Sequence, residues 1–177
     1  MIIMKKILVV VDMQNDFVDG ALGTAEAVAI VPQVVKEINE FDGEIIATYD
    51  THSENYLETA EGKKLPVTHC VKDTKGWQLN SDVQAALDKK GYKQVIKYTF
   101  GSTELPEIIR ECAGDEDFEI ELIGLCTDIC VVSNALLLKA NFYENKISVK
   151  ASCCAGVSPA THNAALDTMR CCQIDVI

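Results

Sequence analysis

Short apolar runs alternate along this chain with segments whose apolar residues recur at helical spacing. Apolar runs of strand length predict strands over residues 7–11, 44–49, 93–97, 118–123, 146–150 and 173–177. Helical spacing predicts helices over residues 25–41, 81–89, 105–112, 131–139 and 158–170, the first burying Val28, Val31, Val35 and Ile38. Strands that alternate with helices are typical of a parallel sheet covered on both faces. We therefore predict a three-layer α/β/α fold with a mostly parallel sheet of about six strands.

Length and charge narrow the class of protein. With 177 residues, 48% of them apolar, the chain suits one globular domain, which we expect to span 1–177. The net charge of −11 argues against binding to nucleic acid or to an anionic membrane. No apolar run approaches the about 20 residues that a membrane span needs. The apolar run near the N-terminus stops at Asp12 and reads as a strand rather than a signal peptide, so we expect a cytoplasmic protein.

Eight cysteines are many for this length. They stand at positions 70, 112, 126, 130, 153, 154, 171 and 172, and no two of them form a C-x-x-C pair. A domain of this size does not need disulfides, so we expect free thiols in a reducing compartment. The cysteines and the acidic charge also leave open a non-catalytic metal-binding or redox-binding protein.

One cysteine lies where a predicted strand leads into a helix, within residues 124–133. Thr127 is a plausible N-cap, with Asp128 in the first turn, which places Cys130 at the third helical position. The helix dipole there favours the thiolate, and the free backbone N–H groups suit an oxyanion. The alternative is that Cys130 is simply a buried cysteine that packs as a small apolar residue.

Other reactive side chains follow the remaining strands. Asp12 follows the first strand and Lys97 ends the third, and ligands of open parallel sheets bind beyond the carboxyl ends of the strands. An acid, an amine and a thiol at one edge suggest nucleophilic catalysis, with Cys130 attacking, Asp12 as base and Lys97 holding Asp12 ionised. The alternatives are a turn or cap role for Asp12 and a surface position for Lys97.

Two histidines lie in the long polar segment after the second strand. Asp50 and His52 open this segment and His69 closes it, and such a set can bind Zn²⁺ or Fe²⁺. The alternative is that they are solvated loop residues. So long an irregular stretch is usually functional or disordered. His162, in the late helix, reads as a surface or cap residue.

Together these motifs carry a resemblance over nearly the whole chain. The chain resembles the isochorismatase-like cysteine hydrolase superfamily, and most of all its nicotinamidase-type members. The matching segments are residues 11–17 around Asp12, Asp50-Thr51-His52 with His69-Cys70-Val71, Lys97, and residues 124–131 around Cys130. The resemblance implies the Rossmann-like hydrolase fold of that superfamily.

The resemblance also implies roles for single residues. It makes Cys130 the nucleophile, Asp12 the general base and Lys97 its partner. It implies a cis peptide bond before Cys126, with the N–H groups of Cys126 and Cys130 as the oxyanion hole. The implied ligands of a divalent metal, zinc before iron or manganese, are Asp50, His52, His69 and Glu61, with Glu58 in reserve. Family members often form dimers or tetramers, so a homo-oligomer is expected.

The implied reaction is hydrolysis of a small carboxamide through a cysteine thioester, with nicotinamide or a close aromatic amide as substrate. Two departures from the nicotinamidase pattern concern the substrate pocket. The segment after Lys97, residues 98–101, is short, and Pro66 stands where some members carry a tryptophan. Phe17, with Phe100 or Tyr56, then has to supply the apolar wall. The alternative within the superfamily is another amidase or a carbamoyl hydrolase.

Overall fold

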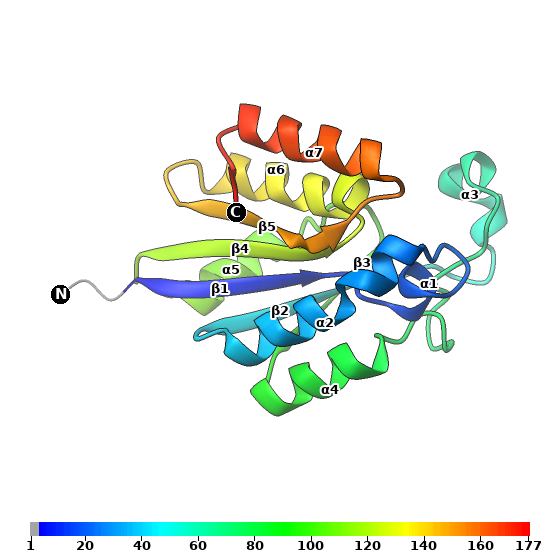
Figure 1. Ribbon diagram of the computed structural model, residues 1–177, viewed down its shortest axis with the longest axis horizontal. Coiled ribbons are helices and arrows are strands. Elements are labelled where there is room, and N and C mark those ends of the chain that lie inside the picture. The colour runs from blue at the N-terminus through cyan, green and yellow to red at the C-terminus, as the bar shows by residue number, and fades with distance from the viewer. Residues whose placement is uncertain (1–3) are drawn as a thin grey trace.

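The computed structural model describes residues 4–177, in which six parallel strands form one sheet (Figure 1). The strands are β1 (Lys5–Val11), β2 (Glu44–Asp50), β3 (Lys93–Lys97), β4 (Phe118–Leu125), β5 (Ile147–Ala155) and β6 (Asp175–Val176). Their order across the sheet is β3-β2-β1-β4-β5-β6, and each neighbouring pair is parallel. The predicted six-stranded parallel sheet is confirmed. The expected domain 1–177 also includes residues 1–3, which lie outside the described part.

Helices cover both faces of this sheet, as Figure 1 shows. One face carries α2 (Ala25–Glu40) and α4 (Ser81–Lys90). The other carries α5 (Leu105–Ala113), α6 (Val132–Asn141) and α7 (Pro159–Cys171). Two short helices, α1 (Asn15–Val18) and α3 (Ala60–Lys64), lie beyond the carboxyl ends of the strands. The three-layer α/β/α prediction is therefore confirmed.

The continuous apolar runs are explained by burial on both faces. Along β1, Leu8 and Val10 pack toward α2 and α4, whereas Ile7 and Val9 pack toward the helices of the other layer. All four are fully buried, because side chains of a strand alternate between two faces and both faces are covered.

Some predicted boundaries were wrong. In α2 the buried positions are Ala27, Val31, Val34 and Ile38, whereas Val28 is exposed and Val35 is half-buried. Strand β5 continues to Ala155, five residues past the predicted end, because its pairing with β4 resumes after a shift in register and buries Cys153, Cys154 and Ala155. The last strand is shorter than predicted because residues 173 and 174 still hydrogen-bond to the end of α7.

The segment after β2 is more regular than its polar sequence indicated. It contains a 3₁₀ turn, Tyr56–Glu58, followed at once by α3. Thr59 caps α3 by accepting a hydrogen bond from the Gly62 N–H at 3.0 Å. The prediction of a long irregular loop was therefore wrong over these residues.

The order in which the chain adds strands to the sheet reverses between β1 and β4. These two strands are neighbours, although β2 and β3 lie between them in the sequence. Such a switch point leaves a crevice beyond the strand ends, where ligands of this fold class bind. The two strands approach closely here: Gly124 has φ +116°, and a Cβ atom on it would lie 2.1 Å from the Val11 carbonyl oxygen. Only glycine fits, and this contact brings the end of β4 against the residue before Asp12.

Candidate active site

Asp12 is the first residue after β1 and is fully buried. It adopts φ +47°, a left-handed conformation that aspartate tolerates better than most residues. Its Oδ1 accepts a hydrogen bond of 2.7 Å from the Thr48 hydroxyl on β2, and its N–H donates to the same hydroxyl oxygen at 3.2 Å. Thr48 therefore fixes one carboxylate oxygen and leaves Oδ2 free for another partner.

Lys97 occupies the centre of the site. The last residue of β3, it is only 2% exposed, and its ammonium lies 2.7 Å from Asp12 Oδ2. The same Nζ atom lies 3.1 Å from Asp50 Oδ1 and 3.5 Å from Cys130 Sγ. The structure thus brings together the three residues that the sequence named as a catalytic set.

Burial dominates the ionisation of this cluster. It raises the pKa of Asp12, an effect that the Lys97 charge opposes and the Asp50 charge reinforces. Burial would lower the pKa of Lys97, but the charges of Asp12, Cys130 and Asp50 outweigh it and raise that pKa. The ammonium therefore stays charged and compensates the carboxylates around it.

The expected low pKa of the Cys130 thiol was wrong. Burial raises it well above the usual value, and the Asp12 charge raises it further, against the opposing effect of Lys97. The reason is depth: Cys130 is 4% exposed, so desolvation exceeds any stabilisation by the helix end. The thiol form of Cys130 is therefore favoured over the thiolate, so a nucleophilic role for this residue would need a base.

The turn that carries Cys130 also differs from the predicted helix start. Residues Thr127–Val131 form a π-helical turn whose N-cap is Cys126, so Thr127 is not the cap and Cys130 is the fourth residue rather than the third. The Cys126 carbonyl oxygen accepts hydrogen bonds from the N–H groups of Ile129 and Val131 at 3.1 and 3.0 Å. The N–H group of Cys130, which lies between them in the sequence, is not among its donors. The Leu125–Cys126 peptide bond is cis, as the family resemblance implied.

The proposed metal ligands converge beside this cluster. Asp50, His52 and His69 offer ligand atoms that all lie within 4.8 Å of one another. Asp50 Oδ2 lies 3.0 Å from His52 Nε2 and 3.6 Å from His69 Nε2. Glu61 Oε1 lies 3.8 and 3.7 Å from the same two nitrogens. Glu58, the reserve candidate, is exposed.

The histidine geometry fits a metal site. His69 Nδ1 is 2.8 Å from the Val67 carbonyl oxygen, so it donates there and leaves the Nε2 lone pair facing the cluster. Two imidazoles and two carboxylates are a ligand set that suits Zn²⁺, Fe²⁺ or Mn²⁺.

Asp50 joins the two halves of the site. Its Oδ1 faces Lys97 and its Oδ2 faces the histidines. Burial would raise its pKa, but the hydrogen bonds from His52 and His69 and the Lys97 charge outweigh it and hold that pKa well below the usual range. A permanently ionised carboxylate therefore lies between the thiol and the histidines.

Three supporting residues escaped the sequence reasoning. Gln14, fully buried, accepts from the Asp50 N–H at 2.8 Å and donates to the carbonyls of Asp50 at 2.8 Å and Trp77 at 2.9 Å. Asp16 accepts from the Cys70 N–H at 2.7 Å, next to His69. Thr48 is the third. The sequence feature that could have identified Gln14 is its position: it is a polar residue in the segment 12–17, three residues after the buried strand β1 ends.

A small cavity of about 40 Å³ opens onto Cys130. Phe17 and Phe100 line it, as predicted, together with Leu22, Asp50, Glu61, Leu65, His69, Cys126 and Ile129. Tyr56 does not: it is fully buried and packs edge-on against His52 and His69 at 4.7 and 4.9 Å between ring centroids. Tyr56 therefore supports the histidines rather than the cavity wall.

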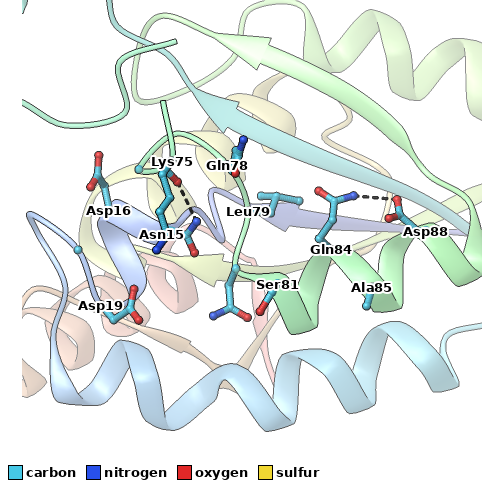
Figure 2. Close-up of a pocket in the computed structure, with 13 residues that line it drawn as sticks. Asn15, Asp16, Asp19, Lys75, Gln78, Leu79, Ser81, Gln84, Ala85 and Asp88 are labelled. Carbon is cyan, nitrogen blue, oxygen red and sulfur yellow. Dashed lines mark hydrogen bonds between the residues drawn. The ribbon is translucent and has the colours of Figure 1, made fainter. Parts of the chain in front are cut away.

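A larger concavity of about 1060 Å³ lies away from this cluster, between α1, the segment 75–80 and α4 (Figure 2). Most of the residues at its border are of polar types, and Figure 2 shows Asn15 hydrogen-bonded to the Lys75 carbonyl and Gln84 to Asp88. None of the predicted site residues lines it, so the chemistry is concentrated at the smaller cavity.

Within residues 4–177, no helix combines the length and apolar character needed to cross a membrane. The eight cysteines are all free thiols in the structure.

Comparison with known proteins gives one family and several relatives. The family model described as "Isochorismatase domain" matches residues 6–177. The nicotinamidase/pyrazinamidase of Mycobacterium tuberculosis is 26% identical over 186 aligned positions, which cover 96% of this chain and 97% of that protein.

Solved structures of other proteins share this fold over nearly the whole chain. The nicotinamidase/pyrazinamidase PncA from Bacillus subtilis superposes with a TM-score of 0.85 at 24% identity, covering 98% of this chain and 99% of that one. The pyrazinamidase of Pyrococcus horikoshii, solved in complex with zinc, gives a TM-score of 0.80 at 26% identity and covers 98% of both chains.

Proposed function

The chain belongs to the isochorismatase family, and we propose that it is an amidohydrolase that converts nicotinamide to nicotinate and ammonia. The observation that carries this proposal is the contact of Lys97 with Asp12 and Cys130 at 2.7 and 3.5 Å, beside the Asp50–His52–His69 group. Relatives named nicotinamidase over nearly their full length support the choice of substrate.

In the first half of the reaction Asp12 takes the Cys130 thiol proton while Sγ attacks the amide carbon. The carbonyl oxygen gains negative charge, which the N–H groups of Cys126 and Cys130 stabilise. Asp12 returns the proton to the nitrogen, the C–N bond breaks, and ammonia leaves a thioester on Cys130. Lys97 keeps its proton throughout and balances the charge on Asp12.

In the second half Asp12 takes a proton from water, whose oxygen attacks the thioester carbon. The C–S bond breaks, the first proton of the water returns from Asp12 to Cys130 Sγ, and the carboxylic acid product loses the second proton to solvent to become the carboxylate. Because burial raises the pKa of Asp12 above the ordinary carboxyl value, its conjugate acid is a better match for repeated proton transfer near neutral pH.

The proposed metal ligands are Asp50, His52, His69 and Glu61, with zinc as the preferred ion and iron or manganese as alternatives. A bound divalent ion supplies a Lewis acid that orients the substrate ring. Phe17 and Phe100 supply apolar contact for that ring, since both line the cavity. We also propose that the enzyme works in the cytoplasm, because eight free thiols suit a reducing compartment. That it forms a homo-oligomer, a dimer or tetramer, is a proposal that rests on the family resemblance alone.

One observation favours a second candidate, an amidase or carbamoyl hydrolase for a smaller substrate. The cavity of about 40 Å³ is far smaller than the roughly 300 Å³ or more of typical ligand pockets. An aromatic amide therefore requires outward movement of Leu65 and Phe100, which are 38% and 46% exposed. A small aliphatic amide requires less movement of these two side chains.

Ammonia release separates these candidates. Purified protein is incubated with nicotinamide, pyrazinamide and a set of aliphatic amides and carbamoyl compounds, with Zn²⁺, Fe²⁺ or Mn²⁺ added or with a chelator. Turnover of nicotinamide with the highest kcat/KM supports the proposal. Release of ammonia only from smaller amides favours the second candidate, and release from none of these compounds under any metal condition refutes both.

A further inference from the structure

The proposed nucleophile, Cys130, lies in the π-helical turn Thr127–Val131, a backbone conformation that is rare in proteins. Its ladder consists of the Val131 N–H to the Cys126 carbonyl and the Val132 N–H to the Thr127 carbonyl. Single π turns are uncommon, and they are frequently found at functional sites. A turn of this kind needs contacts from outside to keep one geometry.

The start of helix α7 supplies two such contacts, one from its first turn and one from Val157, two residues before the helix begins. The Thr127 hydroxyl lies 2.8 Å from His162 Nδ1, and both Asp128 oxygens accept from the Val157 N–H, at 3.1 and 3.2 Å. Thr127 is fully buried, so its hydroxyl needs a protein partner, and it does not cap its own turn. The two contacts secure consecutive residues just ahead of Cys130.

The start of α7 is itself well fixed. The Ser158 hydroxyl caps it by accepting from the Thr161 N–H, the Thr161 hydroxyl oxygen accepts from the Ser158 N–H, and Pro159 follows the cap. The His162 N–H donates to the Ser158 carbonyl at 2.9 Å. The imidazole therefore projects from an ordered turn and can act as a fixed support.

We infer that His162 is a positioning residue for the proposed amide hydrolysis, because its hydrogen bond to Thr127 holds the turn that presents Cys130 to the substrate. The inference rests on the proposed function for its kinetic consequence. His162 does not line the cavity at Cys130, so it acts through Thr127 and not by touching the substrate. His162 was expected to be an ordinary surface or cap residue; it is half-buried and hydrogen-bonded to the buried Thr127 hydroxyl.

The charge state of His162 suits this role. Burial lowers its pKa, and the nearby Asp128 carboxylate opposes this effect without cancelling it. The imidazole is therefore neutral at neutral pH, and Nδ1 can exchange one hydrogen bond with the Thr127 hydroxyl in either tautomer.

The test compares three substitutions at one position. In His162→Asn the side-chain amide can reach the place of Nδ1, in His162→Gln it reaches toward Nε2, and His162→Ala removes both. Asn163→Ala, at an exposed neighbour on the same helix, is the matched control. Each variant is measured for kcat and KM with nicotinamide, for the rate of Cys130 alkylation by iodoacetamide, followed by peptide mass spectrometry, and for its melting temperature.

We expect His162→Ala and His162→Gln to lower kcat by about tenfold to a hundredfold with KM within about twofold, since small misplacement of a reacting group has costs of this order. The Cys130 alkylation rate should change by more than about threefold in the same variants. His162→Asn should restore most of both, and the control should match the wild type.

A second pair tests the same contact from its other side. Thr127→Val removes the hydroxyl at nearly constant shape, and Thr127→Ser keeps it, so Val should reproduce the His162→Ala result and Ser should not. Unchanged kcat and alkylation rates in His162→Ala and Thr127→Val would overturn the inference, even if both variants melt earlier. The inference would also be overturned if His162→Asn and His162→Gln restored kcat and the Cys130 alkylation rate equally. If the wild type hydrolyses no amide, the proposed function fails, and the alkylation rates still decide the role of His162.

Discussion

Gln14 anchors Asp50, the carboxylate that lies between Lys97 and the histidines, and its removal should weaken both the fold and the metal site. Gln14→Leu deletes two buried hydrogen bonds of 2.8 Å and a partly buried one of 2.9 Å while nearly conserving volume. At about 1 kcal/mol for each bond, with buried partners left unsatisfied, we expect a loss of about 3 to 5 kcal/mol in the free energy of unfolding. For a chain of this length that corresponds to a fall of about 10 °C in melting temperature.

The isosteric variant Gln14→Glu sharpens this test. The introduced carboxylate keeps the acceptor for the Asp50 N–H but turns an oxygen toward the carbonyls of Asp50 and Trp77, beside the negative charge of Asp50. Burial and these neighbours raise the pKa of the new carboxyl in the folded state, so the destabilisation is present at high pH and relieved as pH falls through that folded-state pKa.

Both variants are compared with Gln33→Leu, at an exposed position of α2, which should change stability by no more than about 0.5 kcal/mol. Urea unfolding of chelator-treated protein gives the free energy, and titration with Zn²⁺ gives the metal affinity. If Gln14→Leu loses less than about 1 kcal/mol and binds Zn²⁺ as the wild type does, the anchoring role of Gln14 is refuted.

Three further predictions concern packing, the fourth ligand and the buried thiols. Gly124→Ala should destabilise the fold by about 3 kcal/mol or more in urea unfolding, because its Cβ would meet the Val11 backbone; a smaller loss would contradict the close approach. Glu61→Gln should weaken Zn²⁺ binding at least about tenfold, and Glu58→Gln should leave it unchanged; equal affinities in calorimetry would exclude Glu61. Burial raises the pKa of Cys154 to about 12, so iodoacetamide at pH 8 should label it only after denaturation; rapid labelling in the folded protein would contradict this.

The placement of the reactive residues was accessible from the sequence because it depends on strand ends. Once the apolar runs were read as parallel strands, Asp12, Lys97 and the segment around Cys130 had to lie at one edge. The proposed metal ligands followed less directly, since His69 reaches the site only through the fold of residues 51–68.

The supporting contacts could not be predicted in this way. Gln14 to Asp50, Thr48 to Asp12 and His162 to Thr127 each join residues 35 or 36 positions apart, and no local pattern marks them. The prediction of a lowered pKa for the Cys130 thiol failed for a related reason. The sequence indicates a helix end, which lowers a thiol pKa, but not the depth of burial, which raises it more.

Cys130 and Cys126 line the same cavity, so comparing their alanine variants tests the identity of the nucleophile directly. Ammonia release from the preferred amide is measured for both, with melting temperature and metal content as controls for folding. We predict that Cys130→Ala loses more than about a thousandfold in kcat, whereas Cys126→Ala stays within about tenfold because only its backbone N–H takes part. A folded, metal-loaded Cys130→Ala protein that still turns over at a substantial rate, or an equal loss in Cys126→Ala, would contradict the account.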